Sequence, residues 1–355
     1  MKISVLGAGN IGTIMAVEMA AKGHDITMYS SKPDCFSKTL YEYDADDILL
    51  TTGSLANVTS DLSEAVKEAE LILISMPSFM FKDLGKKLEP LVTPAQMIGI
   101  IPGSGGAEFY FAPLIEKGCT FFGLQRVHSI ARLKKYGESV HMLGRKNKLF
   151  VGSVPAWKAE SIAALIESFF DIPCAATKNY LEVTLTPSNP ILHTSRLYSL
   201  FKDYHEGMVY PRNYQFYGEW TDEASRMLIL CDQEEQELCN AIPLDLSDVT
   251  SLQTYYESHT AEAMTRKISS IAAFKGLTSP MLETENGWIP DWTSRYFVAD
   301  FPFGLKIIKD IAVLFDVPTP NIDLIWDWYA SMCPETAACA FSLDIGKQEF
   351  MSLYK

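Results

Sequence analysis

Residues 2–29 read KISVLGAGNIGTIMAVEMAAKGHDITMY. The apolar residues 2–6 predict a buried strand, residues 11–21 an apolar helix, and residues 25–29 a second strand. Gly7, Gly9 and Gly12 lie between the first strand and the helix. A strand, a helix and a second strand within about 30 residues form one βαβ crossover, which joins neighbouring parallel strands. The sequence therefore predicts a parallel sheet that begins at the N-terminus.

The three glycines have separate physical tasks in a loop of the form Gly-x-Gly-x-x-Gly. The first allows a tight turn, the second lets the backbone approach a pyrophosphate, and the third permits close packing of helix on strand. The amides that open the helix then face the anion. We assign Gly7, Gly9, Asn10, Ile11 and Gly12 to a dinucleotide site. The alternative is a glycine turn with a structural role alone.

The alternation of helix and strand continues along the first half of the chain. Helical and apolar strand patterns follow in turn at 61–69, 71–75, 80–88 and 97–101. This is typical of an α/β Rossmann-type, doubly wound parallel sheet. Further on, we expect a hairpin over 140–154 that turns at 145–148, a helix over 156–170 and a short strand near Ala175. The first domain is therefore expected to end after this short strand and to comprise residues 1–180.

The second half of the chain has a different pattern. A length of 355 residues is enough for two cores. Strand patterns nearly vanish after residue 186, and we expect residues 181–355 to form an all-α C-terminal domain. The amphipathic stretches that predict its helices are 191–204, 221–240, 251–271, 296–315 and 320–332. Residues 277–292, which contain Gly, Pro and Trp, are expected to form an ordered loop.

Composition excludes several classes of protein. The formal net charge of −14 and the lack of a basic block argue against a nucleic-acid partner. The seven cysteines contain no Cys-x-x-Cys pair, so we expect reduced thiols and assign no metal site. The longest apolar run, 71–81, is interrupted by Pro77 and is about half of the ~20 residues that span a bilayer. We expect a soluble cytoplasmic protein with no membrane partner.

The end of the second predicted strand bears on the choice of cofactor. An Asp or Glu there accepts hydrogen bonds from the ribose of NAD(H), whereas this chain has Ser30, Ser31 and Lys32. Hydroxyls and a cation suit a 2′-phosphate and favour NADP(H). NAD(H) stays possible if Asp34 or Asp25 reaches the ribose, or if this segment is a solvated loop. Pro77, which follows a later strand, is assigned to the same cofactor site.

Hydride transfer to a carbonyl or imine needs a nearby proton donor. The six histidines are at positions 24, 128, 141, 193, 205 and 259. His193 lies at the expected domain junction, where a second domain presents groups to the nicotinamide. Arg132 and Arg126 follow the strand near Leu124 and are candidates for binding an anionic substrate, or equally for surface positions.

Two segments beyond the junction resemble signatures of the opine dehydrogenase family, which includes octopine and nopaline dehydrogenases. Asn189-Pro-Ile-Leu-His193 is similar to its Asn-x-x-x-His motif. Arg295-Tyr-Phe-Val-Ala-Asp300-Phe-Pro-Phe-Gly-Leu305 is similar to Arg-Tyr-x-x-x-Asp-x-Pro-x-Gly-Leu. The resemblance covers both domains. One departure is residues 127–132, where the family often has a Pro-Trp-x-Cys-Arg-like stretch, so substrate selection is expected to differ.

The resemblance implies a reductive condensation in which an amino acid and an α-keto acid form an imine that NAD(P)H reduces. By the same resemblance His193 is the catalytic acid and base, Asp300 orients and supports it, and Arg295 binds a substrate carboxylate. Arg132 is a further substrate-binding candidate, and Asn189 is assigned to the cofactor site. Taken by themselves, Asp300 also suits a helix cap, and Arg295 an ion pair with Asp291. Homodimerisation is left open.

Two other functions fit part of the pattern. A ketopantoate- or 2-hydroxy-acid-type NADP reductase also joins a Rossmann domain to a helical one, but it typically uses a Lys early in the second domain. Here His193 precedes any Lys, the first being Lys202. A non-catalytic NAD(P)-sensing protein would keep the glycine loop without using His193, Asp300 and Arg295 for chemistry.

Overall fold

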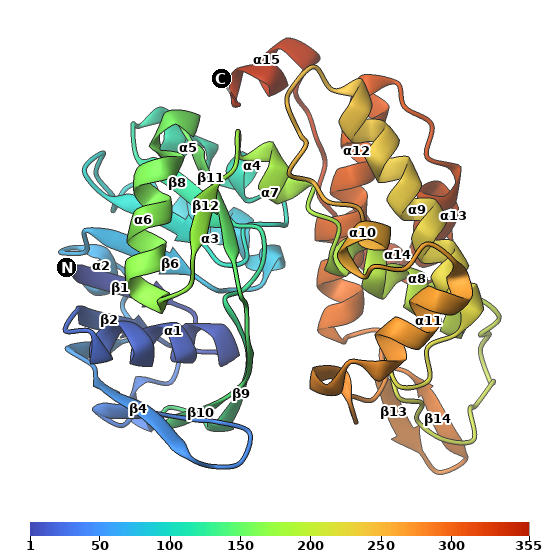
Figure 1. Cartoon of the computed structure of the whole chain (residues 1–355), viewed down its shortest axis with the longest axis horizontal. Coiled ribbons are helices and arrows are strands. Elements are labelled where there is room, and N and C mark those ends of the chain that lie inside the picture. The colour runs from blue at the N-terminus through green and yellow to red at the C-terminus, as the bar shows by residue number, and fades with distance from the viewer. Residues whose placement is uncertain (355) are drawn as a thin grey trace. The chain divides into compact units, whose positions relative to one another are not determined.

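The structure is a computed structural model, and it describes residues 1–354 (Figure 1). The chain divides into two compact units, residues 1–184 with the segment that starts at Met351, and residues 185–350. The C-terminal segment, which we expected in the helical domain, belongs with the first unit. There the Tyr354 hydroxyl donates a hydrogen bond of 2.8 Å to the buried Glu108 carboxylate.

The first unit is built on an eight-stranded sheet. Six strands are parallel, and β11 runs antiparallel to β8 while pairing in parallel with the edge strand β12. The expected doubly wound parallel sheet is thus confirmed, with a mixed edge. In spatial order the strands are β12 (Cys174–Ala176), β11 (Leu149–Val154), β8 (Thr120–Leu124), β7 (Met97–Ile100), β6 (Leu71–Ile74), β1 (Lys2–Leu6), β2 (Asp25–Tyr29) and β5 (Asn57–Thr59).

Helices cover both faces of this sheet because its strands are apolar on both sides. Phe122 packs in the core under α1 and α6, whereas its neighbour Phe121 stacks on Phe111 beside α5. The helices of the unit are α1 (Asn10–Ala21), α2 (Leu62–Val66), α3 (Phe81–Leu88), α4 (Ala107–Tyr110), α5 (Ala112–Glu116), α6 (Ala159–Phe170) and α7 (Leu181–Thr184), with short 3₁₀ turns η1 (Pro33–Cys35), η2 (Ser78–Met80) and η3 (Ala156–Lys158).

A second, four-stranded sheet packs against α1. Its order is β4 (Leu49–Ser54), β3 (Thr39–Tyr43), β10 (Ser139–Arg145) and β9 (Ser129–Lys135). The backbones approach closely, because a Cβ at Gly53 would lie 2.5 Å from the Val17 carbonyl oxygen. The hairpin expected over 140–154 is wrong. β10 pairs with β9 and β3, β11 joins the large sheet, and residues 146–148 only connect the two sheets.

The second unit is helical apart from one hairpin. Thr221 and Thr260 cap α9 and α11, since their hydroxyl oxygens accept from Ala224 and Ala263 amides. The elements are α8 (Asn189–Phe201), α9 (Asp222–Ala241), α10 (Leu252–Tyr255), α11 (Ala261–Ser270), η4 (Ala272–Phe274), β13 (Met281–Thr284), β14 (Gly287–Pro290), the π-helix η5 (Tyr296–Leu305), α12 (Lys306–Phe315), α13 (Pro320–Met332) and α14 (Pro334–Ala338); α15 (Lys347–Ser352) leads back to the first unit.

Three sequence expectations for this unit need correction. The stretch 277–292 contains the β13–β14 hairpin in place of a loop, because Met281 to Thr284 pairs with Gly287 to Pro290. The helical stretch 251–271 is two helices with a break between them, and 296–315 is a π-helix followed by α12. Among the described residues no helix is both long and apolar enough to span a membrane.

Candidate active site

The glycine loop lies between β1 and α1 and has the geometry that its sequence predicts. Gly7 has φ +117°, a conformation that L side chains rarely adopt. A Cβ on Gly12 would lie 1.7 Å from the Gly7 carbonyl oxygen, so only glycine fits there. A Cβ on Gly9 would meet nothing within 4 Å. That open space beside the α1 N-terminus fits a pyrophosphate group, and the loop therefore suits a dinucleotide.

The site stands at the point where the strand order reverses, between β1 and β6. Ligands bind outside the carboxyl ends of strands at such a switch point. Ser75, directly after β6, donates its hydroxyl to the Gly7 carbonyl at 3.1 Å and so ties the two loops together. Pro77 follows at the start of η2 and is partly exposed. The loop that carries Pro77 is thus positioned beside the glycine loop.

The start of α1 is also held from the second sheet. Asn10 Oδ1 accepts a hydrogen bond of 2.9 Å from the Leu133 amide in β9, while Ile11 packs against the core. Arg132 is therefore next to a residue that contacts the glycine loop. Its side chain is exposed, and Nη1 donates to the Ala131 carbonyl at 2.9 Å.

The three residues after β2 have different environments. Ser30 is only 4% exposed, and its hydroxyl lies 2.8 Å from the Tyr136 hydroxyl and accepts from the Lys32 amide. Ser31 and Lys32 are exposed. Sequence reasoning missed Tyr136, which comes from the turn between β9 and β10 and carries no motif of its own. Ser30 thus shapes this loop through internal bonds, whereas Ser31 and Lys32 face solvent.

Strand geometry shows which of the two acids considered for NAD(H), Asp25 or Asp34, lies near the cofactor end of β2. Asp25 opens β2, opposite Lys2, while the cofactor end of β2 is Tyr29. At about 3.3 Å per residue, Asp25 lies roughly 13 Å from that end. Asp34 lies in η1, close to Lys32, and is exposed. Only Asp34 is therefore in a position to reach a ribose from this segment.

In the second unit, α8 presents His193 to Asp300. Nδ1 of His193 lies 2.7 Å from Oδ2 of Asp300, and both side chains are largely buried. An ionised carboxylate can only accept, so the shared proton belongs on Nδ1. Asp300 therefore favours the Nδ1–H tautomer, in which Nε2 is the nitrogen able to accept a proton. The pair that the sequence motifs implied is present, and Asp300 bonds to His193 instead of capping a helix.

The π-helix η5 brings Asp300 to this position. Pro302 lacks an amide and Phe303 leaves helical geometry at φ −123°, so the ordinary helical pattern is interrupted beside Asp300. Gly304 allows α8 to come close, because a Cβ there would lie 2.9 Å from Cγ of Pro190. The prolines and glycine of the two motifs are thus the residues that set the distance between the helices.

A third side chain completes the surroundings of His193. The Tyr217 hydroxyl lies 2.8 Å from Nε2, and Tyr217 is 5% exposed. Arg196, one turn after His193, anchors the loop of Tyr217 by donating to the carbonyls of Phe216 and Glu219 at 3.0 and 2.9 Å. Burial lowers the pKa of Arg196 to about 10. Tyr217 lies in an irregular segment without periodicity, so no sequence signal pointed to it.

Arg295 and Asn189 flank the pair on the same two elements. Arg295 precedes η5 and is exposed, and within residues 1–354 Asp291 accepts from Thr293, not from Arg295. Its guanidinium is thus available to an anion. Asn189 is the first residue of α8 and is also exposed. Arg132 and the other residues assigned to the cofactor site lie in the other unit.

His128 belongs to a charged cluster around Glu18 of α1. This imidazole is fully buried, stacks on Phe170 at 4.1 Å, and its Nε2 lies 2.9 Å from Glu18 Oε2. Burial by itself would raise the pKa of Glu18, but His128 and then Arg145 hold it below its usual value. His128 is therefore a packed structural residue.

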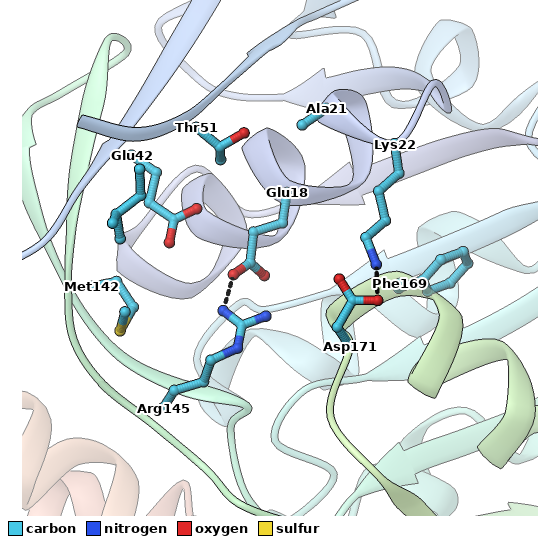
Figure 2. Close-up of a pocket in the computed structure, with 10 residues that line it drawn as sticks. Glu18, Ala21, Lys22, Glu42, Thr51, Met142, Arg145, Phe169 and Asp171 are labelled. Atoms are coloured by element: carbon cyan, nitrogen blue, oxygen red, sulfur yellow. Dashed lines mark hydrogen bonds and ion pairs between the residues drawn. The ribbon is translucent and has the colours of Figure 1, made fainter.

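A cavity of about 390 Å³ lies beside this cluster. Figure 2 shows the residues that line it, among which Glu18 pairs with Arg145 and Lys22 with Asp171. The Glu42 carboxylate also points into it, with no hydrogen bond from the described residues. Burial, and then the charge of Glu18, raises the pKa of Glu42 to about 7. The cavity thus contains one carboxyl group without a matching cation.

Comparisons with known sequences agree with both halves of this description. Residues 176–333 match the family described as NAD/NADP octopine/nopaline dehydrogenase, alpha-helical domain. Residues 2–108 match the N-terminus of NAD-dependent glycerol-3-phosphate dehydrogenase. Tauropine dehydrogenase of Arabella iricolor is 26% identical over 92% of this chain and 90% of its own length. Opine dehydrogenase of Haliotis discus hannai is 27% identical over 92% and 89%.

Solved structures agree on the fold. Octopine dehydrogenase in complex with NADH and L-arginine superposes with a TM-score of 0.82 at 21% identity, covering 94% of this chain and 90% of that one. Yersinopine dehydrogenase with NADP+ gives a TM-score of 0.70 at 12% identity, covering 95% and 92%. A 2-dehydropantoate 2-reductase from Geobacter metallireducens gives 0.65 at 15% identity, covering 94% and 100%.

The glycine loop at the switch point, followed by a helical unit of this kind, defines an NAD(P)-dependent oxidoreductase that acts on CH–NH bonds. Relatives named tauropine, opine and octopine dehydrogenase each match over 92% of this chain. The chain is similar over nearly its whole length to members of the opine dehydrogenase family.

Proposed function

We propose that this enzyme catalyses the NAD(P)H-dependent reductive condensation of an amino acid with an α-keto acid, and the reverse oxidation. The observation that carries the proposal is the His193–Asp300 hydrogen bond of 2.7 Å in the helical unit. The relatives support the substrate class, since octopine dehydrogenase structures contain L-arginine or pyruvate with NADH. The reaction requires the two units to bring the nicotinamide and His193 to the same substrate.

The chain's own residues have three tasks in this reaction. His193 moves protons at Nε2 while the carbinolamine loses water to form the imine. Asp300 holds Nδ1 and stabilises the imidazolium whenever Nε2 is protonated. Arg295, and Arg132 from the other unit, receive substrate carboxylates through planar guanidinium groups. When bound, the nicotinamide supplies or accepts the hydride.

The described geometry supports the cofactor residues of the proposal. The loop from Gly7 to Gly12 and the amides at the start of α1 hold the pyrophosphate. Pro77 in the first unit and Asn189 in the second are the remaining residues that we assign to the cofactor. The exposed Ser31 and Lys32 favour the 2′-phosphate of NADP(H), with Ser30 supporting their loop. NAD(H) is the second cofactor expected to bind.

The function is tested by following NADPH and NADH oxidation with pyruvate and a panel of amino acids. We expect oxidation that depends on both the keto acid and the amino acid. His193→Ala should lower turnover by roughly 10²–10⁴ and leave cofactor affinity nearly unchanged. His205→Ala is the matched control, because His205 is in the same unit and bonds to the Glu206 carbonyl.

Two outcomes contradict the proposal in different ways. Oxidation with a keto acid alone would identify a reductase of the ketopantoate or 2-hydroxy-acid type. Cofactor binding without turnover on any pair of substrates would identify a non-catalytic NAD(P)-sensing protein. Wild-type turnover in His193→Ala would remove His193 from the mechanism.

A further inference from the structure

The Tyr217 hydroxyl is hydrogen-bonded to Nε2 of His193, which is the nitrogen that the proposed chemistry uses. Asp300 holds Nδ1, so every proton that His193 takes up or releases must pass at Nε2. Tyr217 Oη lies 2.8 Å from that atom. With the proton on Nδ1, Nε2 is an acceptor, so the phenol O–H donates to it. Any substrate proton that reaches Nε2 therefore has to displace Tyr217 or travel through it.

Packing makes displacement of the Tyr217 ring costly. The ring is stacked on Phe274 at a centroid distance of 4.1 Å and is nearly parallel to Trp220, at 7°. Phe216 packs edge-on against it at 4.8 Å. Aromatic pairs of this kind contribute about 0.5–1.5 kcal/mol each beyond their buried area. Rotating the ring away from His193 would break these contacts together.

The backbone of Tyr217 is held as firmly as its ring. Arg196 is 2% exposed and bonds to the carbonyls of Phe216 and Glu219, one on each side of Tyr217. Because His193 and Arg196 lie three residues apart on α8, the helix that carries the imidazole also positions the phenol. The distance between the two groups is thus set by one rigid element.

We propose that Tyr217 relays protons between His193 and the substrate, so that Asp300, His193 and Tyr217 act in series. This inference rests on the proposed function. In the condensing direction His193 first takes up, through the phenol, the proton that the substrate ammonium group loses when its nitrogen adds to the keto carbon, so that Nε2–H of the imidazolium then donates to the phenol oxygen. The Tyr217 O–H bond next breaks and its proton passes to the carbinolamine hydroxyl. The C–O bond then breaks, water leaves, and the nitrogen lone pair forms the C=N bond of an iminium. The Nε2–H proton of the imidazolium restores the phenol, which leaves His193 neutral, and nothing is oxidised or reduced in this step.

The test is Tyr217→Phe, which keeps the stacked ring and removes only the hydroxyl. We expect kcat to fall about 10²-fold or more, with the KM for NAD(P)H unchanged. The dependence of kcat on the fraction of D₂O should be curved in the wild type, where the Tyr217 and the His193 protons both move during loss of water, and linear in the variant. Thermal unfolding shows that the variant is folded, and Tyr204→Phe in the same unit is the control.

A Tyr217→Phe enzyme with kcat within twofold of the wild type and an unchanged D₂O dependence would overturn the relay. If His193→Ala is inactive in the same assays, that result leaves the proposed function standing and removes Tyr217 alone. If the wild-type enzyme does not couple an amino acid to a keto acid, the proposed function is wrong and the relay falls with it. The relay is also wrong if kcat falls in Tyr217→Phe but its dependence on the fraction of D₂O stays as curved as in the wild type.

Discussion

Nδ1 of His193 lies 2.7 Å from Oδ2 of Asp300, although 107 residues separate them in the chain. Each residue belongs to a motif that also contains residues packing α8 on η5, as Pro190 and Gly304 do. The two motifs therefore depend on each other, because the packing of their helices brings His193 and Asp300 to hydrogen-bond distance.

The charge of Asp300 is the first property to test. Asp300→Asn keeps the shape of the side chain but no longer stabilises the imidazolium or enforces the Nδ1 tautomer. We expect kcat to fall by roughly 10²–10⁴ with cofactor dissociation constants unchanged. Steady-state kinetics and fluorescence titration with NAD(P)H measure the two effects. Asp316→Asn, which alters an exposed pair with Lys347, is the control. Full activity in Asp300→Asn would show that the carboxylate plays no part.

The glycine loop allows its structural and ligand-binding roles to be separated. In Gly12→Ala the new Cβ would meet the Gly7 carbonyl at 1.7 Å, and neither backbone can yield easily. We expect a destabilisation of about 1–3 kcal/mol or more. In Gly9→Ala the new Cβ has no neighbouring atom within 4 Å, so the Tm without cofactor should equal that of the wild type. Added NAD(P)H should raise the Tm of this variant by less than it raises that of the wild type. Equal Tm values for Gly12→Ala and wild type without cofactor would refute this account.

Cofactor preference should depend on Lys32. The side chain is exposed at the end of β2, and a hydrogen bond to a charged group contributes about 1.5–3 kcal/mol. Lys32→Asp should therefore shift the ratio of NADPH to NADH affinity by about 10- to 100-fold toward NADH. Lys38→Asp, an exposed change on the following segment, should leave the ratio unaltered. An unchanged ratio in Lys32→Asp would remove the argument for a 2′-phosphate.

Glu42 should make stability depend on pH. Burial, and then the charge of Glu18, raises its pKa from 4.5 to about 7. The folded protein thus binds this proton more tightly than the unfolded chain does. The resulting stabilisation is complete below about pH 4.5 and is lost as the pH rises through 7. Glu42→Gln removes the ionisation, so its Tm should exceed that of the wild type by an amount that grows between pH 5 and pH 8.

Glu160→Gln, an exposed change on α6, serves as the control for that series. A Tm difference between Glu42→Gln and wild type that stays constant from pH 5 to pH 8 would show that Glu42 does not titrate in this range. The comparison of difference curves also separates Glu42 from Glu108, whose pKa burial likewise raises to about 7.

Local sequence patterns predicted the features whose causes are local. The apolar run Leu71–Ile74 had to be a buried strand, and the glycines of the first loop had to precede a helix, because each depends on neighbouring residues alone. The partners of β10 could not be predicted in this way. Hydrogen bonds of a strand are made to residues far along the chain, and β10 finds them in β9 and β3.

Some residues of the candidate site could likewise be found from local sequence patterns, and others only from the tertiary structure. The sequence by itself determined the glycine loop, the two helical motifs and hence the residues His193, Asp300 and Arg295. Only the tertiary structure decided that Ser30 is engaged with Tyr136, that His128 is a buried partner of Glu18, and that Tyr217 lies on Nε2 of His193. The physical reason is that a side chain's chemistry depends on its neighbours in space, which packing brings together from segments without a shared pattern.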